Sequence, residues 1–152
     1  MNNISTRAQV VTRRTYCRPK NAEGTEFESW DEVINRVIQH QRWLWERALT
    51  HKIMPDMPLH DITENLLEWV ILNETQSEEL EQLRQLMLDR KVAVSGRTFW
   101  LGGTDIGKKI EASQFNCAAL NIETVYDIVD AFWLLLNGAG VGFRPVAGTL
   151  TG

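Results

Sequence analysis

The distribution of glycine is the feature that most constrains how this chain folds. Nine of its ten glycines lie at position 96 or later, and none occurs between residues 25 and 95. Glycine destabilises the interior of a helix and is favoured in turns and close backbone approaches. We therefore expect residues 1–95 to form a mainly helical region, and residues 96–152 to form a second region richer in turns and extended segments.

The first region carries signals for three helices. Ser29 and Glu32 match a capping box, and apolar residues follow it at helical spacing as far as Ala48. A second helix is expected at 62–72, with Ile71 among its buried residues. A third is expected from a possible capping box at Thr75–Glu78 to Arg90.

The second region predicts strands joined by one apolar helix. Residues 115–122 suit a short buried strand, and Thr124 with Asp127 suits the start of a helix. Gly138 is expected to end that helix, and residues 138–143 to form a tight backbone loop leading into an extended piece. The side chains predicted to line the buried face of the helix are Val125, Ile128, Val129, Phe132, Trp133 and Leu136.

Charge and cysteine usage limit the classes of function. Sixteen basic against twenty acidic residues give a net charge of −4, which lacks the clustered basic surface of a nucleic-acid binder. The longest apolar run, residues 131–136, is far shorter than the roughly 20 residues that span a bilayer. Cys17 and Cys117 form no disulfide framework. We expect a cytoplasmic protein that binds neither nucleic acid nor membrane.

Two features of the sequence could carry chemistry, and neither of them is a metal site. The three histidines match no metal-binding spacing, so no metal site is expected. Cys117 is either an inert buried thiol or part of a site beside the polar Asn116. Three alternating glycines at 138, 140 and 142 form either a structural turn or a loop that touches a ligand. They follow the carboxyl end of a helix, which argues against an independent nucleotide-phosphate site there.

Four segments together resemble the ribonucleotide reductases, and most closely the adenosylcobalamin-dependent class II enzymes that act on ribonucleoside triphosphates. The matching segments lie in the order expected for that family and extend from residue 15 to about residue 145. They are Thr15–Arg18 with Glu28–Glu32, Gly96–Thr104, Asn116–Cys117 and Asn137–Phe143.

The resemblance implies a role for each matching residue. Cys117 corresponds to one of two cysteines that reduce the ribose by forming a disulfide, on the first strand of a ten-stranded α/β barrel. Gly138, Gly140 and Gly142 correspond to a segment beneath the substrate ribose, and Asn116 is a weaker candidate for substrate contact. Cys17 stands where the family usually has serine, so no redox role is assigned to it.

The resemblance also implies partners outside this chain. Family members are several times longer, so we expect an α+β amino-terminal fragment: a helical region, 1–95, leading into the first strands of an incomplete barrel, 96–152. Adenosylcobalamin, the second cysteine and the remaining C-terminal half would lie elsewhere. An external dithiol such as thioredoxin would restore the cysteines, and the fragment would be inactive alone.

A non-catalytic alternative is a small helical interaction module. Six tryptophans in 152 residues make it arguable. Trp43 and Trp45 cannot both face one core from a single helix, because residues two apart diverge around its axis. One of them could then anchor a partner protein.

Overall fold

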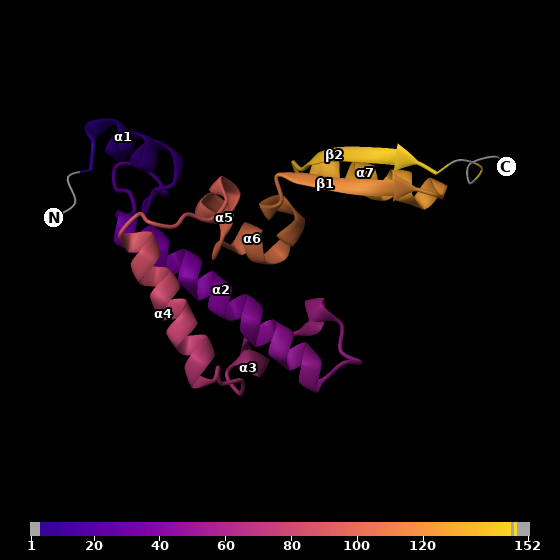
Figure 1. Cartoon of the computed structure of the whole chain (residues 1–152), viewed down its shortest axis with the longest axis horizontal. Helices are drawn as coiled ribbons and strands as arrows, with labels where there is room; N and C mark the ends of the chain where they lie inside the picture. Colours follow the sequence, from indigo (N-terminus) through magenta and orange to yellow (C-terminus); the bar gives the residue numbers. More distant parts are fainter. Residues whose placement is uncertain (1–3, 147, 149–152) are drawn as a thin grey trace. The chain divides into compact units, whose positions relative to one another are not determined.

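The computed structural model describes residues 4–146 and 148. Residues 1–3, 147 and 149–152, which belong to the predicted regions 1–95 and 96–152, lie outside the described residues. The chain divides into two compact units, Met1–Ser95 and Gly96–Gly152. Each unit is described by itself (Figure 1).

The first unit begins with a helix that the sequence patterns did not indicate. Helix α1, Thr6–Thr15, is capped by the hydroxyl of Ser5, which accepts a hydrogen bond from the backbone N–H of Ala8 at 3.3 Å. Only Thr12 is buried among its residues, so it has no wide apolar stripe that periodicity could detect.

Two longer helices, α2 (Trp30–Ile53) and α4 (Glu74–Leu88), lie side by side and form the core of this unit (Figure 1). The capping box that opens α2 is confirmed, because Ser29 and Glu32 exchange their two hydrogen bonds. The apolar stripe of α2 is confirmed in its first half only, since Ala48 is exposed. The buried apolar side chains of these two helices are Val33, Ile34, Val37, Ile38, Leu80 and Met87.

The second half of α2 buries polar groups instead. His40 and Arg47 are 1% and 7% exposed, and Trp43 lies between them. The Trp43 ring stacks on His40 with 5.4 Å between centroids, and the Arg47 guanidinium lies 4.4 Å from the centre of the same ring. Arg47 also donates a hydrogen bond to the carbonyl of Leu59 at 3.0 Å. Aromatic stacking and a charged hydrogen bond therefore replace aliphatic packing here.

The helix predicted at 62–72 is wrong in length. A 3-10 turn, η1 (Leu59–Asp61), precedes a single helical turn, α3 (Glu64–Leu67), and Ile71 is 88% exposed. Beyond α3 the backbone tightens into a turn, in which the N–H of Val70 donates to the carbonyl of Leu67, three residues back, at 3.0 Å.

The start of α4 was also predicted two residues late. Asn73, not Thr75, is the capping residue: its side-chain oxygen accepts from the N–H of Gln76 at 2.8 Å, and the Gln76 side chain accepts from Asn73 at 3.0 Å. Glutamine fills the position that glutamate fills in the box predicted at 75–78. An asparagine side chain, which caps helices at least as well as threonine, therefore fixes this end.

The carboxyl end of α4 places an arginine where glycine is usual. Arg90 has φ +58°, and the N–H of Lys91 reaches back to the carbonyl of Leu86 at 2.9 Å. This left-handed position just past a helix is most often glycine, because a Cβ there costs about 1 kcal/mol. Arg90 therefore follows the helix directly in a backbone conformation that residues with side chains rarely adopt.

The second unit opens with short helices, although the sequence predicts a region richer in turns and extended segments. These are α5 (Gly96–Leu101), α6 (Asp105–Lys109) and the 3-10 turn η2 (Glu111–Gln114). Phe99 of α5 is 3% exposed and anchors this part. A turn at 102–104 joins α5 to α6, with Gly103 at φ +76°.

A β–α–β unit follows, made of β1 (Cys117–Ile122), α7 (Val125–Leu136) and β2 (Gly140–Pro145). The two strands pair in parallel, and α7 packs against both of them (Figure 1). The mixed helix-and-strand class is therefore confirmed. The tight loop predicted at 138–143 is wrong beyond its first residues, because Gly140 and Gly142 lie within β2.

Burial in this unit differs from the expectation. The face of α7 predicted to be buried is largely exposed, with Leu136 87% and Val125 67% accessible, and Ala131 is the helix's buried residue. Strand β1 is likewise half-covered rather than buried, with its residues alternating in exposure. Two strands offer too little surface to cover a twelve-residue apolar helix. Among the described residues, the helices are all too short or too polar to cross a membrane.

Candidate functional site

The strand register brings the sequence-predicted site residues together. Cys117 is the direct partner of Gly140, and Ala119 is the partner of Gly142. The backbone N–H of Gly140 donates to the carbonyl of Asn116 at 2.8 Å, which fixes the start of β2 beside the start of β1. Residues that are 23 positions apart in the sequence are thus neighbours across one parallel ladder.

Cys117 lies on the face of the sheet that α7 leaves open. Side chains alternate between the faces of a strand, and α7 covers the face of Ile122, Phe143 and Pro145, which line an apolar cavity with it. The opposite face carries Cys117, Ala119 and Asn121 from β1 and, paired with them, Gly140, Gly142 and Arg144 from β2. Cys117 is a free, exposed thiol.

The glycines of β2 keep the surface beside the thiol flat. A Cβ added at Gly142 meets nothing within 4 Å, and one added at Gly140 makes only an ordinary contact of 3.5 Å with the Asn116 carbonyl. Neither glycine is therefore required by packing within this unit. Their effect is to leave the backbone next to Cys117 accessible to another group.

Gly138 has a different role, which is structural. It has φ +86° at the end of α7, where its N–H and that of Ala139 bond to the carbonyls of Leu135 and Leu134 at 2.9 and 3.0 Å. A Cβ at Gly138 would lie 3.2 Å from a guanidinium nitrogen of Arg97. The prediction that glycine ends this helix is confirmed, and this glycine is explained by the turn.

Arg97 is a residue of this region to which sequence reasoning gave no role. Its two terminal nitrogens donate hydrogen bonds to the carbonyls of Ser113, at 2.9 Å, and Gly138, at 2.6 Å. One side chain therefore ties the segment before β1 to the turn before β2. The signal in the sequence was its place in the Gly96–Thr104 motif, which identified the segment but not the contact.

Arg144 was also not predicted. It lies on the open face two residues beyond Gly142 and pairs with Asn121. It is the cation that the β1–β2 pair itself presents on this face. Alternation within a strand could have placed it there, but only once the strand and its register were known.

The site lies at the amino ends of both strands. Ligands of parallel sheets usually bind at the carboxyl ends of the strands, so the position of Cys117 is unusual for a two-strand parallel pair. The carboxyl end of α7 is close by in sequence, and the Arg97 guanidinium bonded to Gly138 supplies positive charge at that otherwise negative end.

Cys17 is in the other compact unit and has other surroundings. It is half-buried, and burial raises the pKa of its thiol above the ordinary value, with the nearby Glu28 carboxylate adding to the effect. A thiol held protonated is a poor nucleophile. Within residues 4–146 and 148, no cluster of three or more histidine, cysteine, aspartate or glutamate side chains could hold a metal.

Comparison with known proteins identifies relatives. The chain is 32% identical over 157 aligned residues to the adenosylcobalamin-dependent ribonucleoside-triphosphate reductase of Lactobacillus helveticus. It is 30% identical over 108 residues to the protein of that name from Lactobacillus delbrueckii subsp. bulgaricus, and 27% identical over 157 residues to that of Lactobacillus acidophilus. No protein-family model and no solved structure matches the chain.

These matches cover most of this chain but only a small part of each relative. They cover 71–90% of this chain but only 12–19% of the relatives, so the chain spans less than a fifth of the length of the reductases that it matches. The family resemblance carried by the four motif segments is confirmed. Over nine tenths of its length, this chain is thus homologous to part of the adenosylcobalamin-dependent ribonucleoside-triphosphate reductases.

Proposed function

We propose that this chain forms the part of a ribonucleoside-triphosphate reductase that supplies one reducing cysteine, Cys117. The observation that supports the proposal is the open face of the β1–β2 pair. On this face the exposed thiol of Cys117 lies directly beside Gly140, and Gly142 is the next residue of β2 on the same face. The relatives' name gives the substrate class, a ribonucleoside triphosphate.

The reaction requires two electrons and two protons at the ribose. The bond between C2′ and its hydroxyl oxygen breaks, the oxygen leaves as water, and a hydrogen replaces it on C2′. Two cysteine thiols supply these electrons and protons and become a disulfide. Cys117 is one of them; the other would come from outside residues 1–152. An external dithiol of the thioredoxin type then exchanges with the disulfide and restores both thiols.

The residues around Cys117 suit an approaching ribose. The β2 backbone at Gly140 and Gly142 carries no side chains, so a sugar could lie flat against it within reach of the thiol. Asn116, immediately before Cys117, is exposed and offers an amide that can donate to or accept from a hydroxyl. The Arg144 guanidinium, farther along the same face, would attract the triphosphate.

The same surroundings do not fit adenosylcobalamin. One thiol, one side-chain amide and bare backbone on an exposed strand end are too small and too open for a corrinoid, which is a large macrocycle. We therefore assign the cofactor, which would supply the radical that starts the thiyl-radical chemistry, to another part of the reductase. The barrel of which β1 and β2 would be the first strands is part of the same proposal.

Activity of the complete reductase that contains this chain tests the assignment. Cys117→Ser should abolish repeated formation of deoxyribonucleotides from ribonucleoside triphosphates in the presence of adenosylcobalamin and dithiothreitol. Cys17→Ser, the matched control, should retain it. Repeated turnover by the Cys117→Ser enzyme would refute the role of Cys117. Absence of any reductase activity in the unchanged protein would refute the function itself.

A further inference from the structure

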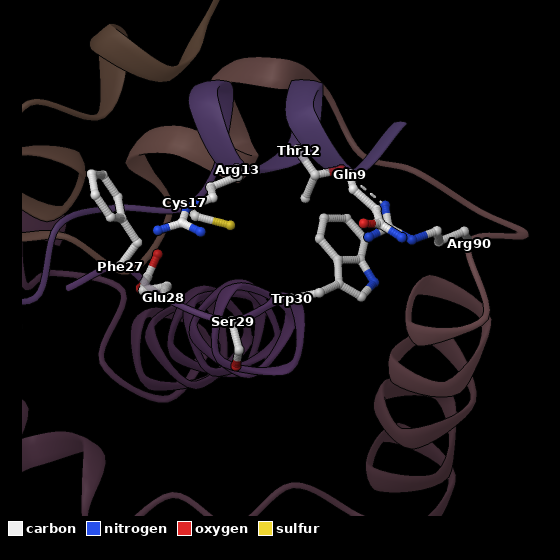
Figure 2. A pocket seen from close by; sticks show the side chains of 9 residues that line it. All are labelled: Gln9, Thr12, Arg13, Cys17, Phe27, Glu28, Ser29, Trp30 and Arg90. Carbon is white, nitrogen blue, oxygen red and sulfur yellow. Dashed lines mark hydrogen bonds between the residues drawn. The ribbon is translucent and has the colours of Figure 1, made fainter. Parts of the chain in front are cut away.

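The first compact unit contains a cavity that the proposed reductase site does not use. Its volume is about 320 Å³, and it opens between α1, the segment after α1, the start of α2 and the end of α4 (Figure 2). Figure 2 shows Cys17 and Arg13 on one side of it and Trp30 and Arg90 on the other. The residues that line it are Gln9, Thr12, Arg13, Cys17, Phe27, Glu28, Ser29, Trp30 and Arg90.

The charged groups of the lining are the guanidiniums of Arg13 and Arg90 and the carboxylate of Glu28. Among the charges near the Cys17 thiol, the Glu28 carboxylate has the largest effect on its pKa, and the guanidiniums of Arg13, Arg90 and Arg36 oppose it. That carboxylate is already neutralised: Arg36 donates to both of its oxygens, at 2.8 and 2.9 Å, and the N–H of Arg18 donates at 3.0 Å. Arg13 and Arg90 are thus left as the uncompensated charges of the lining.

Both of these arginines retain hydrogen-bond donors. The Arg13 guanidinium lies 5.5 Å from the centre of the Phe27 ring. Arg90 lies 4.0 Å from the centre of the Trp30 ring and donates from Nη1 to Thr12 at 3.1 Å. Its Nε is buried and has no hydrogen-bond acceptor within the described part of the chain. The arginines therefore offer charge and donors in a preset arrangement.

The rest of the lining is mixed in character. Phe27 and Trp30 provide aromatic walls, while Gln9, Thr12 and Ser29 provide uncharged polar groups. Ser29 caps, and Trp30 begins, the 24-residue helix α2, whose first turn also carries Asp31 and Glu32. Guanidinium groups match the oxygens of phosphate in geometry, so the Arg13 side of the cavity suits a phosphate.

We propose that this cavity binds a small phosphate-bearing molecule, with its phosphate beside Arg13 and Cys17 and its remaining part against Phe27 and Trp30. The cavity lies in the first compact unit and the Cys117 face in the second, and the proposal does not depend on the proposed reductase function. The neutral form of Cys17, favoured by burial, does not repel an anion. Cys17 therefore also serves as a reporter inside the cavity.

Protection of Cys17 from alkylation tests the proposal. The full 152-residue chain carrying Cys117→Ser has Cys17 as its single thiol, and N-ethylmaleimide is an uncharged reagent. Its reaction rate is measured with inorganic phosphate, pyrophosphate or ATP at millimolar concentrations, and with sodium chloride at equal ionic strength. A ligand at ten times its Kd should slow alkylation about tenfold, because only the free protein reacts.

The comparison among ligands distinguishes the sources of the phosphate. Protection by phosphate or pyrophosphate would show that the anion alone is recognised. Protection by ATP alone would show that the aromatic walls contribute to binding. Either result supports the site. Equal slowing by sodium chloride, or no slowing by any of the three ligands, would overturn it.

A matched pair of variants tests the role of Arg13. The Arg13→Gln variant should lose most of the protection of Cys17. Arg14 is the exposed neighbour of Arg13 on α1 and does not line the cavity, so the Arg14→Gln variant should keep the protection. Both positions are exposed, so neither change should unfold the unit; circular dichroism checks this. Equal protection in Arg13→Gln and Arg14→Gln would overturn the proposal.

Discussion

Arg97 donates a 2.6 Å hydrogen bond to the carbonyl of Gly138, across 41 residues of sequence. Its other terminal nitrogen holds the carbonyl of Ser113 at 2.9 Å, so the segments that precede β1 and β2 share one side chain. The Cys117–Gly140 pair begins directly after these two points. The alignment of the proposed site thus depends on a residue that does not itself lie on the open face.

Removing this link should loosen the second unit. Arg97→Ala loses two charged hydrogen bonds and leaves two carbonyls without their donor, which we expect to cost about 1–3 kcal/mol in the free energy of unfolding. A lysine at this position can reach only one of the two carbonyls, so the stability of the Arg97→Lys variant should lie between those of the unchanged chain and Arg97→Ala. Chemical denaturation measures this loss, and hydrogen exchange at the Gly140 amide locates it. Unchanged exchange there in Arg97→Ala would contradict the link.

Substitution of Gly138 and Gly142 by alanine should affect the stability of the fold to different extents. Gly138→Ala forces a side chain into a left-handed backbone and against Arg97, at a cost of about 1–2 kcal/mol in unfolding free energy. Gly142→Ala adds a methyl group to open space and should change stability little. Thermal unfolding of the two variants checks the contrast. Equal destabilisation would mean that Gly142 also has a packing role.

Local signals in the sequence were the most dependable. The Ser29–Glu32 box was predicted because each partner lies three residues from the other, and Gly138 because helix ends require a special backbone. Helix α1 escaped notice because its charged residues show no apolar period. Its place is instead fixed by contacts with distant residues, such as that of Thr12 with Arg90, 78 positions away.

In the candidate site, too, motifs were predictable from the sequence, whereas contacts between distant residues were not. Motif order indicated Cys117 and the three glycines, and the parallel register then placed Cys117 beside Gly140. The sequence could not show that a Cβ at Gly142 would meet open space, because that depends on what surrounds β2 in the fold. An apolar stripe on α7 likewise indicated a face suited to burial without showing what covers it.

Acid should weaken the amino end of α2 through Glu32. The hydrogen bond from Lys20, at 2.7 Å, and those from Ser29 lower the pKa of this carboxyl to about 2 from its usual 4.5. A carboxyl with a lowered pKa in the folded state stabilises the fold above its unfolded pKa and loses that contribution as pH falls toward the folded value. The stabilisation should therefore decline between about pH 4.5 and 2.

Glu32→Gln provides the measurement. The variant should be less stable than the unchanged chain at neutral pH, and the difference should shrink as the pH falls through this range. The pair is exposed, so added salt should also reduce the difference. Glu79→Gln, at an exposed position of α4, is the matched control. A difference that stays constant from pH 7 to pH 2 would contradict the role of the Glu32 charge.

The exposed apolar face of α7 predicts how the 152-residue chain behaves in solution. Val129 and Leu136, 58% and 87% exposed, lie seven residues apart on one side of the helix. Apolar patches of this kind bind dyes and promote self-association. The chain should therefore bind anilinonaphthalene sulfonate and sediment as species larger than a monomer.

The Val129→Gln, Leu136→Gln double variant should reduce dye binding and self-association while keeping its helical signal. The Asp130→Asn variant, on the same helix, should reduce neither dye binding nor self-association. A monomeric chain without dye binding would instead favour the self-contained interaction module, because a piece of a larger barrel requires that face to be covered.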